Sequence, residues 1–87
     1  MRTRDLVARI SKRVGTGITQ QDVRKIIDAL VLESKDILHT GEEIRFRGLC
    51  KFYIARSRGK YRLKIEAFPA FNDEIETRFV ENKENLV

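Results

Sequence analysis

The sequence is short, basic and poor in cysteine. Its 87 residues include 18 Lys or Arg, 13 Asp or Glu and one Cys, with a formal net charge of +5. A chain of this length buries only about 60% of the surface that its unfolded form exposes, which predicts one small domain of marginal stability as a lone monomer. One Cys excludes an internal disulfide framework. Since neither a secretory signal pattern nor a membrane-spanning apolar run is found, we expect a cytoplasmic protein without membrane contacts.

The positive charge is concentrated in one segment. Residues 45–64 hold eight Lys or Arg and no Asp or Glu, whereas residues 1–44 are nearly balanced and residues 65–87 are acidic. A patch of one sign indicates a polyanionic ligand, because solvated surfaces usually mix both signs. The alternative interpretation is the solvated face of a sheet. The segment favours phosphate binding over that alternative.

Two helices are predicted before this segment. Residues 3–14 have amphipathic spacing, and Thr3 is placed to cap their first turn. Thr19, with Asp22 three residues on, marks the start of a second helix from Gln20 to about Thr40. The apolar stripe of this helix is too wide for the first helix and one sheet to cover, so we expect a second subunit on the remainder. The stripe consists of Val23, Ile26, Ile27, Leu30, Val31, Ile37 and Leu38.

After Gly41 the apolar period changes from 3.6 to 2, which predicts three strands. Arg58-Gly59-Lys60 is a turn signal between the second and third strands. The alternation places Arg56 and Arg58 on the same side of the strand as apolar Phe52. Since charged side chains do not face the core, we expect the hairpin to project from the body of the domain at this point. The opposite, polar face is predicted to be basic on all three strands, with Arg45, Arg47, Lys51, Arg62 and Lys64.

The end of the chain predicts a last helix. Pro69 ends the sheet because it has no amide to donate. Asn72 or Asp73 is expected to cap the helix, and a tail from Glu81 onward has little to hold it. The order of elements predicts a single α+β domain over residues 1–87, with two N-terminal helices, a three-stranded antiparallel sheet and a C-terminal helix.

Catalysis is not expected. One His and one Cys cannot form a zinc site of the usual ligands within one subunit. The glycines match neither the phosphate-loop nor the dinucleotide-binding pattern. His39 and Cys50 are interpreted as structural. We therefore expect no enzymatic activity, no cofactor and no metal.

Four segments, taken in order, point to a family. They are Thr3-Arg4-Asp5-Leu6, the helix ITQQDVRKIIDALVLESKDIL (18–38), the strand entry GEEIRFRGLCKF (41–52) and Pro69-Ala70-Phe71. No single motif is specific, but together they resemble the bacterial histone-like HU and integration host factor family over nearly the whole chain.

The resemblance implies an intertwined homodimer, or a heterodimer with a related subunit, whose two sheets form a saddle under double-stranded DNA. It implies contacts to the phosphate backbone and the minor groove with little base reading. Residues 1–40 would be the dimerisation region, 41–69 the saddle and arm, and 70–87 the C-terminal helix and tail. The DNA-binding residues that it implies, together with the basic start of the first helix, are Arg2, Arg4, Arg45, Arg47, Lys51, Arg56, Arg58, Lys60, Arg62 and Lys64.

Departures from the family pattern modify this expectation. The hairpin between Ile54 and Pro69 is shorter than in the family and lacks its tip proline, so the arm extends only on the order of 10 Å at ~3.3 Å per residue. Cys50 replaces the family's second turn glycine. Asn72-Asp73-Glu74 places acid where the family usually meets phosphate.

Two functions remain open at this point. The first is an architectural, nucleoid-associated protein that binds DNA of any sequence and kinks it weakly or not at all, encoded by a bacterium or by a phage that acts in the host cytoplasm. The second is a regulatory subunit that heterodimerises with, or antagonises, full-length HU relatives. The basic sheet favours the first.

Overall fold

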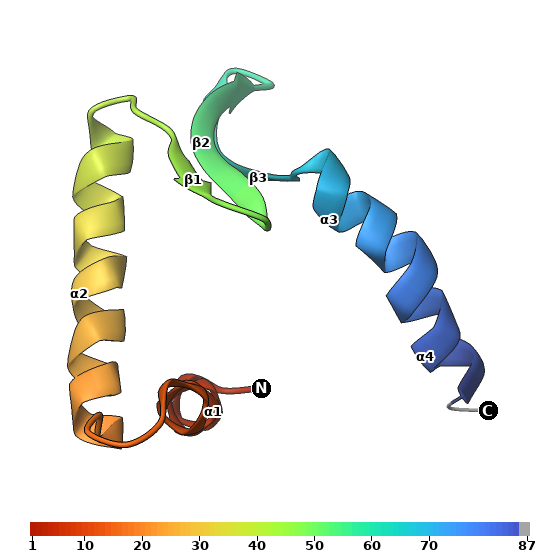
Figure 1. Ribbon diagram of the computed structural model, residues 1–87. Coiled ribbons are helices and arrows are strands. Elements are labelled where there is room, and N and C mark those ends of the chain that lie inside the picture. Colours follow the sequence, from red (N-terminus) through yellow and green to blue (C-terminus); the bar gives the residue numbers. More distant parts are fainter. Residues whose placement is uncertain (86–87) are drawn as a thin grey trace. The chain divides into compact units, whose positions relative to one another are not determined.

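The computed structural model describes residues 1–85 of the chain (Figure 1). The predicted order of elements, and with it the α+β fold, is confirmed. By contacts the chain divides into two units, one from Met1 to Asp36 and one that begins at Ile37, and each is described by itself. The elements are α1 (Thr3–Val14), α2 (Gln20–His39), β1 (Ile44–Phe46), β2 (Cys50–Ser57), β3 (Lys60–Ala67), α3 (Pro69–Glu74), the π-helical turn η1 (Ile75–Phe79) and α4 (Val80–Asn85).

Helix α1 has a different N-cap residue from the one predicted. Arg2 is the N-cap residue and Thr3 is already helical, so the prediction that Thr3 caps the helix is wrong. The backbone N–H of Arg2 instead donates to Oδ2 of Asp5 at 3.1 Å. A carboxylate in the first turn also lies at the positive end of the helix dipole, which favours this arrangement.

Helix α2 begins with the predicted reciprocal cap. The backbone N–H of Thr19 donates to Oδ2 of Asp22, and the N–H of Asp22 donates to Oγ1 of Thr19, both at 3.1 Å. These two bonds satisfy amide groups that the helix itself leaves unpaired. The helix ends at His39, and Gly41 follows with a φ of 89°, a left-handed conformation that glycine adopts without steric cost.

Few apolar side chains are buried. Within residues 1–85 the buried hydrophobic residues are Val7, Val23 and Cys50. Along the predicted stripe of α2, Ile26 is 62% exposed and Leu30 and Val31 are nearly half exposed. Thus a large apolar surface of this helix remains in contact with solvent in the single chain. None of the described helices is long and apolar enough to span a lipid bilayer.

The three strands form one antiparallel sheet with β2 in the centre (Figure 1). Strand β1 pairs with the first three residues of β2, and β3 pairs with all of it. The registers place apolar side chains on one face, where the rings of Phe46 and Phe52 meet edge to face with centroids 5.3 Å apart. Cys50 lies on the same face and is 7% exposed.

The last helix begins earlier than the sequence predicts. Phe68 is the N-cap in an extended conformation and Pro69 is the first helical residue, so the prediction that Asn72 or Asp73 caps this helix is wrong. Proline suits the first turn because its missing N–H has no helical partner there. The helix continues through η1 to Asn85, so the tail predicted from Glu81 is helical as far as that residue. Residues 86–87 of that tail lie outside the described residues.

Candidate nucleic-acid interface

A tight turn joins β2 to β3. Ser57 pairs with Lys60, and the two residues between them have positive φ, 53° for Arg58 and 80° for Gly59. Two consecutive positive φ values are typical of the type I′ turn, whose twist matches that of the flanking strands. Glycine adopts this conformation freely, whereas a side chain such as that of Arg58 costs about 1–2 kcal/mol. The predicted turn is therefore present, with a strained arginine in it.

Beyond β1 the sheet continues as a two-stranded ribbon. The pairs from Tyr53 with Lys64 to Ser57 with Lys60 have no third strand beside them. These five pairs span about 14 Å at ~3.4 Å per residue. The hairpin therefore projects beyond the three-stranded part of the sheet.

One face of the sheet carries most of the cations and is named the basic face. The registers bring Arg45, Lys51 and Lys64 to the same side, together with Tyr53. The full set of cations on the basic face is Arg45, Lys51, Lys60, Arg62 and Lys64. Arg47 departs from the predicted alternation, because β1 ends at Phe46 and Arg47 lies exposed in the following turn.

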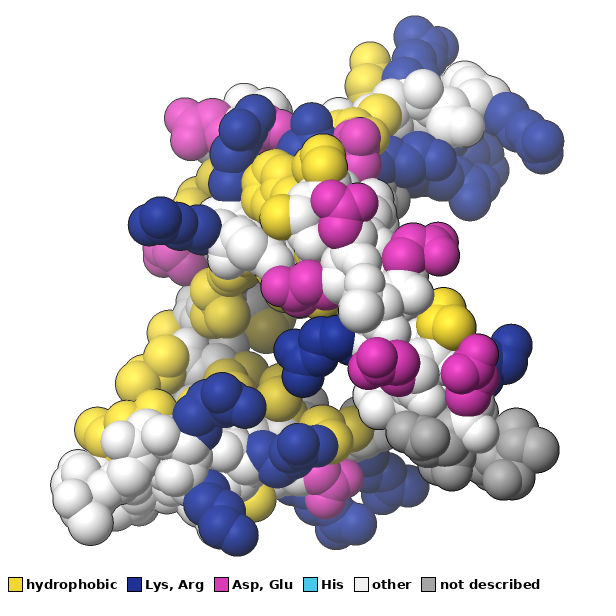
Figure 2. Space-filling model, turned by 45° about the vertical axis from the view of Figure 1, so that its right-hand side comes forward, with side chains coloured by type: hydrophobic (Ala, Val, Ile, Leu, Met, Phe, Trp, Pro, Cys, Tyr) yellow, Lys and Arg dark blue, Asp and Glu magenta, His cyan; other side chains and the backbone are white. Residues whose placement is uncertain are grey.

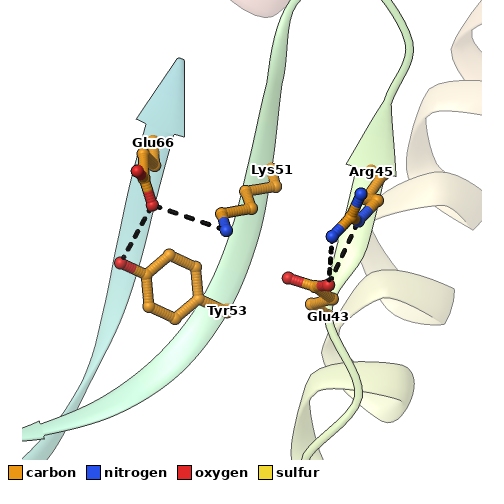
Figure 3. A network of polar contacts seen from close by, with 5 residues as sticks. All are labelled: Glu43, Arg45, Lys51, Tyr53 and Glu66. Atoms are coloured by element: carbon orange, nitrogen blue, oxygen red, sulfur yellow. Dashed lines mark hydrogen bonds and ion pairs between the residues drawn. The ribbon is translucent and has the colours of Figure 1, made fainter. Parts of the chain in front are cut away.

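Two of these cations have acidic partners (Figure 3). The guanidinium of Arg45 donates from Nε and Nη2 to Oε1 of Glu43 at 3.1 and 2.9 Å. The Nζ of Lys51 lies 3.6 Å from Oε2 of Glu66, to which the Tyr53 hydroxyl also donates at 3.5 Å. The side chain of Arg45 is 63% exposed and that of Glu66 is 59% exposed. Such solvent-exposed pairs contribute about 0.2–1 kcal/mol each, so a phosphate can replace the carboxylate at little cost.

The end of the hairpin differs from the part of the basic face beside β1, because residues 57–64 include Lys and Arg but no Asp or Glu. Ser57, Arg58, Arg62 and Lys64 line a cavity of about 280 Å³. Figure 2 shows a group of Lys and Arg side chains at the upper right, where the hairpin lies, with no acidic side chain among them in this view. We name the four lining residues the tip pocket.

Arg56 lies on the other face of the hairpin. Its register partner is Tyr61, and its guanidinium carbon lies 5.7 Å from the centroid of the Tyr61 ring. This distance is within the range of a cation–π interaction. The prediction that Arg56 lies on the side of Phe52 is correct, and the register places it on the other face from Arg62 and Lys64. The same prediction for Arg58 is wrong, because Arg58 lies in the turn beyond β2 and lines the tip pocket.

Residues 1–65 match the family model for bacterial DNA-binding proteins. This match covers well over half of the chain. The chain belongs to the bacterial DNA-binding protein family. The predicted resemblance to HU is thereby confirmed. Within this HU-like chain the match includes both N-terminal helices, β1, β2 and most of β3.

Solved HU structures have the same fold. A mutant HU protein from Thermotoga maritima superposes with a TM-score of 0.74 at 25% sequence identity, covering 86% of this chain and 99% of that one. An Anabaena HU crystallised with DNA superposes with a TM-score of 0.73 at 12% identity, covering 88% of this chain and 99% of that one. The second likeness supports the fold alone. No match was found among curated protein sequences.

The structure distributes the predicted site residues of this HU-like chain over several places. Arg2 and Arg4 are exposed at the start of α1, in the helical unit. The hairpin unit holds the rest, on the basic face, in the turns or, for Arg56, on the opposite face.

Three residues of the site were missed from the sequence. Glu43 and Glu66 pair with basic-face cations, and Ser57 lines the tip pocket. The two acids could have been found. Glu43 has the parity of Arg45, and counting back from a two-residue turn pairs Glu66 with Lys51.

Proposed function

We propose that the chain binds double-stranded DNA, with little dependence on sequence, through the basic face of a dimer. The observation that carries this proposal is the register, which brings cations from all three strands to one side of the sheet. Family membership supports the same assignment. Lysine and arginine side chains on a sheet contact phosphates, which position a protein on a duplex without reading its bases.

Binding proceeds by exchange of charge partners. When the basic face approaches a duplex, phosphate oxygens replace Glu43 beside Arg45 and Glu66 beside Lys51. The condensed counterions of the DNA are released, and this release makes the affinity fall steeply with salt. Tyr53, which faces Lys64 across the two strands and follows Lys51 on the same face of β2, contributes a flat apolar surface against the sugars.

The dimer is proposed from the exposed stripe of α2. Ile26, Leu30 and Val31 present a run of apolar side chains that one chain leaves in water. A second copy with the same stripe covers both surfaces around a twofold axis, which is the usual symmetry of small homodimers. A related subunit with a similar helix can take the same place, so the heterodimer belongs to this proposal as a variant.

Weak bending of the duplex is part of the same proposal. Minor-groove architectural proteins kink DNA by inserting apolar wedges between base pairs. The tip of this hairpin is Arg58-Gly59, the ribbon is about 14 Å long at ~3.4 Å per residue, and the one proline of the chain, Pro69, begins α3. A short ribbon with a charged tip holds the backbone without entering the base stack. The protein would act on the nucleoid in the cytoplasm of a bacterium, or of a host if a phage encodes it.

The second candidate function is a regulatory subunit that pairs with full-length relatives and alters their DNA binding. The ion pairs of Arg45 and Lys51 favour it, because they neutralise part of the surface that would meet phosphate. The two functions differ in the affinity of the pure protein for duplex DNA, which is high in the first and incidental in the second.

The deciding experiment measures duplex affinity at two salt concentrations, with sedimentation of the same sample. We expect log K to fall against log salt with a slope near 0.9 per phosphate neutralised, a value set by counterion release. Replacing Arg45, Arg47, Arg62 and Lys64 by Ala should weaken binding about equally on unrelated sequences. Unchanged affinity in this quadruple variant would exclude the basic face as the interface.

A further inference from the structure

We propose that the tip pocket is a seat for one backbone phosphate of duplex DNA, which anchors each hairpin in place of an inserted wedge. The inference rests on the proposed function and names a contact within it. The pocket is a cavity of about 280 Å³ lined by Ser57, Arg58, Arg62 and Lys64. Three of its four lining side chains are cationic and the fourth is a hydroxyl.

The sequence builds this hollow by alternating small and long side chains across the two strands. Ala55 pairs with Arg62, and Ser57 pairs with Lys60. Side chains directly opposite on one face of an antiparallel pair are neighbours. Ala55 and Ser57 on β2 are small and partly buried, whereas Arg62 and Lys64 on β3 are long and line the cavity together with Ser57. A concave site on the basic face results.

The turn supplies the third cation. Arg58 is the one residue other than glycine with a positive φ within the described part of the chain. A two-residue turn of this type accepts Asn, Asp or Gly more readily than Arg. An unfavourable residue that is kept in a strained conformation points to a function for its side chain. Here that side chain lines the pocket with Arg62 and Lys64.

The chemistry of the pocket fits phosphate. An arginine guanidinium presents a planar fork that bonds two phosphate oxygens at once, and a lysine adds a point charge. The Ser57 hydroxyl can donate a further hydrogen bond. The tip differs from the rest of the basic face, because the ion pairs formed within residues 1–85 include Arg45 and Lys51 but none of the pocket's cations. The pocket therefore holds positive charge that is free to meet an anion.

The test compares substitutions that change the pocket with one that changes only charge. Arg62→Ala removes the fork, and Arg62→Lys keeps the charge but loses the two-oxygen geometry. Arg56→Ala is the matched control, because Arg56 lies in the same hairpin but on its other face and does not line the pocket. All these side chains are exposed or partly exposed at the hairpin, so the variants should keep their fold.

In duplex binding we expect Arg62→Ala to lose about tenfold or more in affinity and Arg62→Lys several-fold, since hydrogen bonds to charged groups are strong. The salt slope of Arg62→Ala should fall by about 0.9 for each pocket that is lost. Arg56→Ala should lose about twofold with a nearly unchanged slope, as expected for an exposed charge that lies off the basic face. Equal losses of affinity in Arg62→Lys and Arg56→Ala would overturn the proposed phosphate seat.

A second readout needs no DNA. Titration with inorganic phosphate, followed by NMR of the backbone amides and the arginine Nε–H groups, should give saturable shifts confined to residues 57–64. Arg62→Ala should abolish these shifts and Arg56→Ala should keep them. Shifts spread evenly over all cationic positions would refute the pocket. Saturable local shifts in a protein that does not bind duplex would show an anion site in the pocket but would overturn both the proposed function and the anchoring of DNA there. Duplex binding without these shifts would overturn the seat alone.

Discussion

The acidic partners of the basic face give the sharpest prediction. Glu43 binds Arg45, and Glu66 binds Lys51, so each must be displaced before a phosphate reaches its cation. Replacing both acids by Gln removes this competition and preserves the size of the side chains. The double variant Glu43→Gln, Glu66→Gln should therefore bind duplex DNA more tightly than the natural chain.

The magnitude follows from the exposure of the pairs. With side chains 28–63% exposed, each pair contributes about 0.5 kcal/mol, near the middle of the range for surface ion pairs. The proposed dimer has four such pairs, so the gain is about 2 kcal/mol, or roughly thirtyfold in affinity. The salt slope should also become steeper, because more phosphates are neutralised.

The assay is fluorescence anisotropy with a labelled duplex at about 50 and 200 mM salt, where counterion release separates the variants. The matched control is Glu81→Gln, Glu84→Gln, which changes the charge equally at two exposed acids of α4 that form no ion pair in the described part of the chain. We expect a gain of twofold or less in the control, since distant exposed charges are screened. Equal affinity in the two double variants would refute the reasoning.

Three further predictions concern the turn, the dimer and the bend. Arg58→Gly should raise the free energy of unfolding by about 1 kcal/mol in denaturant titration, because it relieves the left-handed arginine, and lower stability would contradict the assigned turn. Leu30→Asp should shift the protein to monomer in sedimentation, whereas Lys25→Asp on the opposite side of α2 should not, and a dimeric Leu30→Asp variant would exclude the stripe as the interface. Circularisation of short duplexes should detect no sharp kink, and efficient circularisation would show that the hairpin bends DNA after all.

Local patterns in the sequence were enough to place most elements. The apolar spacing of α2 and the Thr19–Asp22 pair marked its start, because capping involves residues that are three positions apart. The Arg58-Gly59-Lys60 signal placed the hairpin, and the hairpin then set the parity of Arg62 and Lys64. The two errors in helix capping, at Thr3 and at Asn72 or Asp73, arose where several residues compete to begin a helix.

What the sequence by itself determined is the order of elements, the family and the concentration of positive charge in residues 45–64, because these depend on residue type and spacing. The tertiary structure alone decided which cations are paired and which share a cavity. The pairing of Lys51 with Glu66 and the grouping of Ser57, Arg58, Arg62 and Lys64 depend on register and side-chain direction across strands. Distances between side chains from different strands are set only when the sheet is formed.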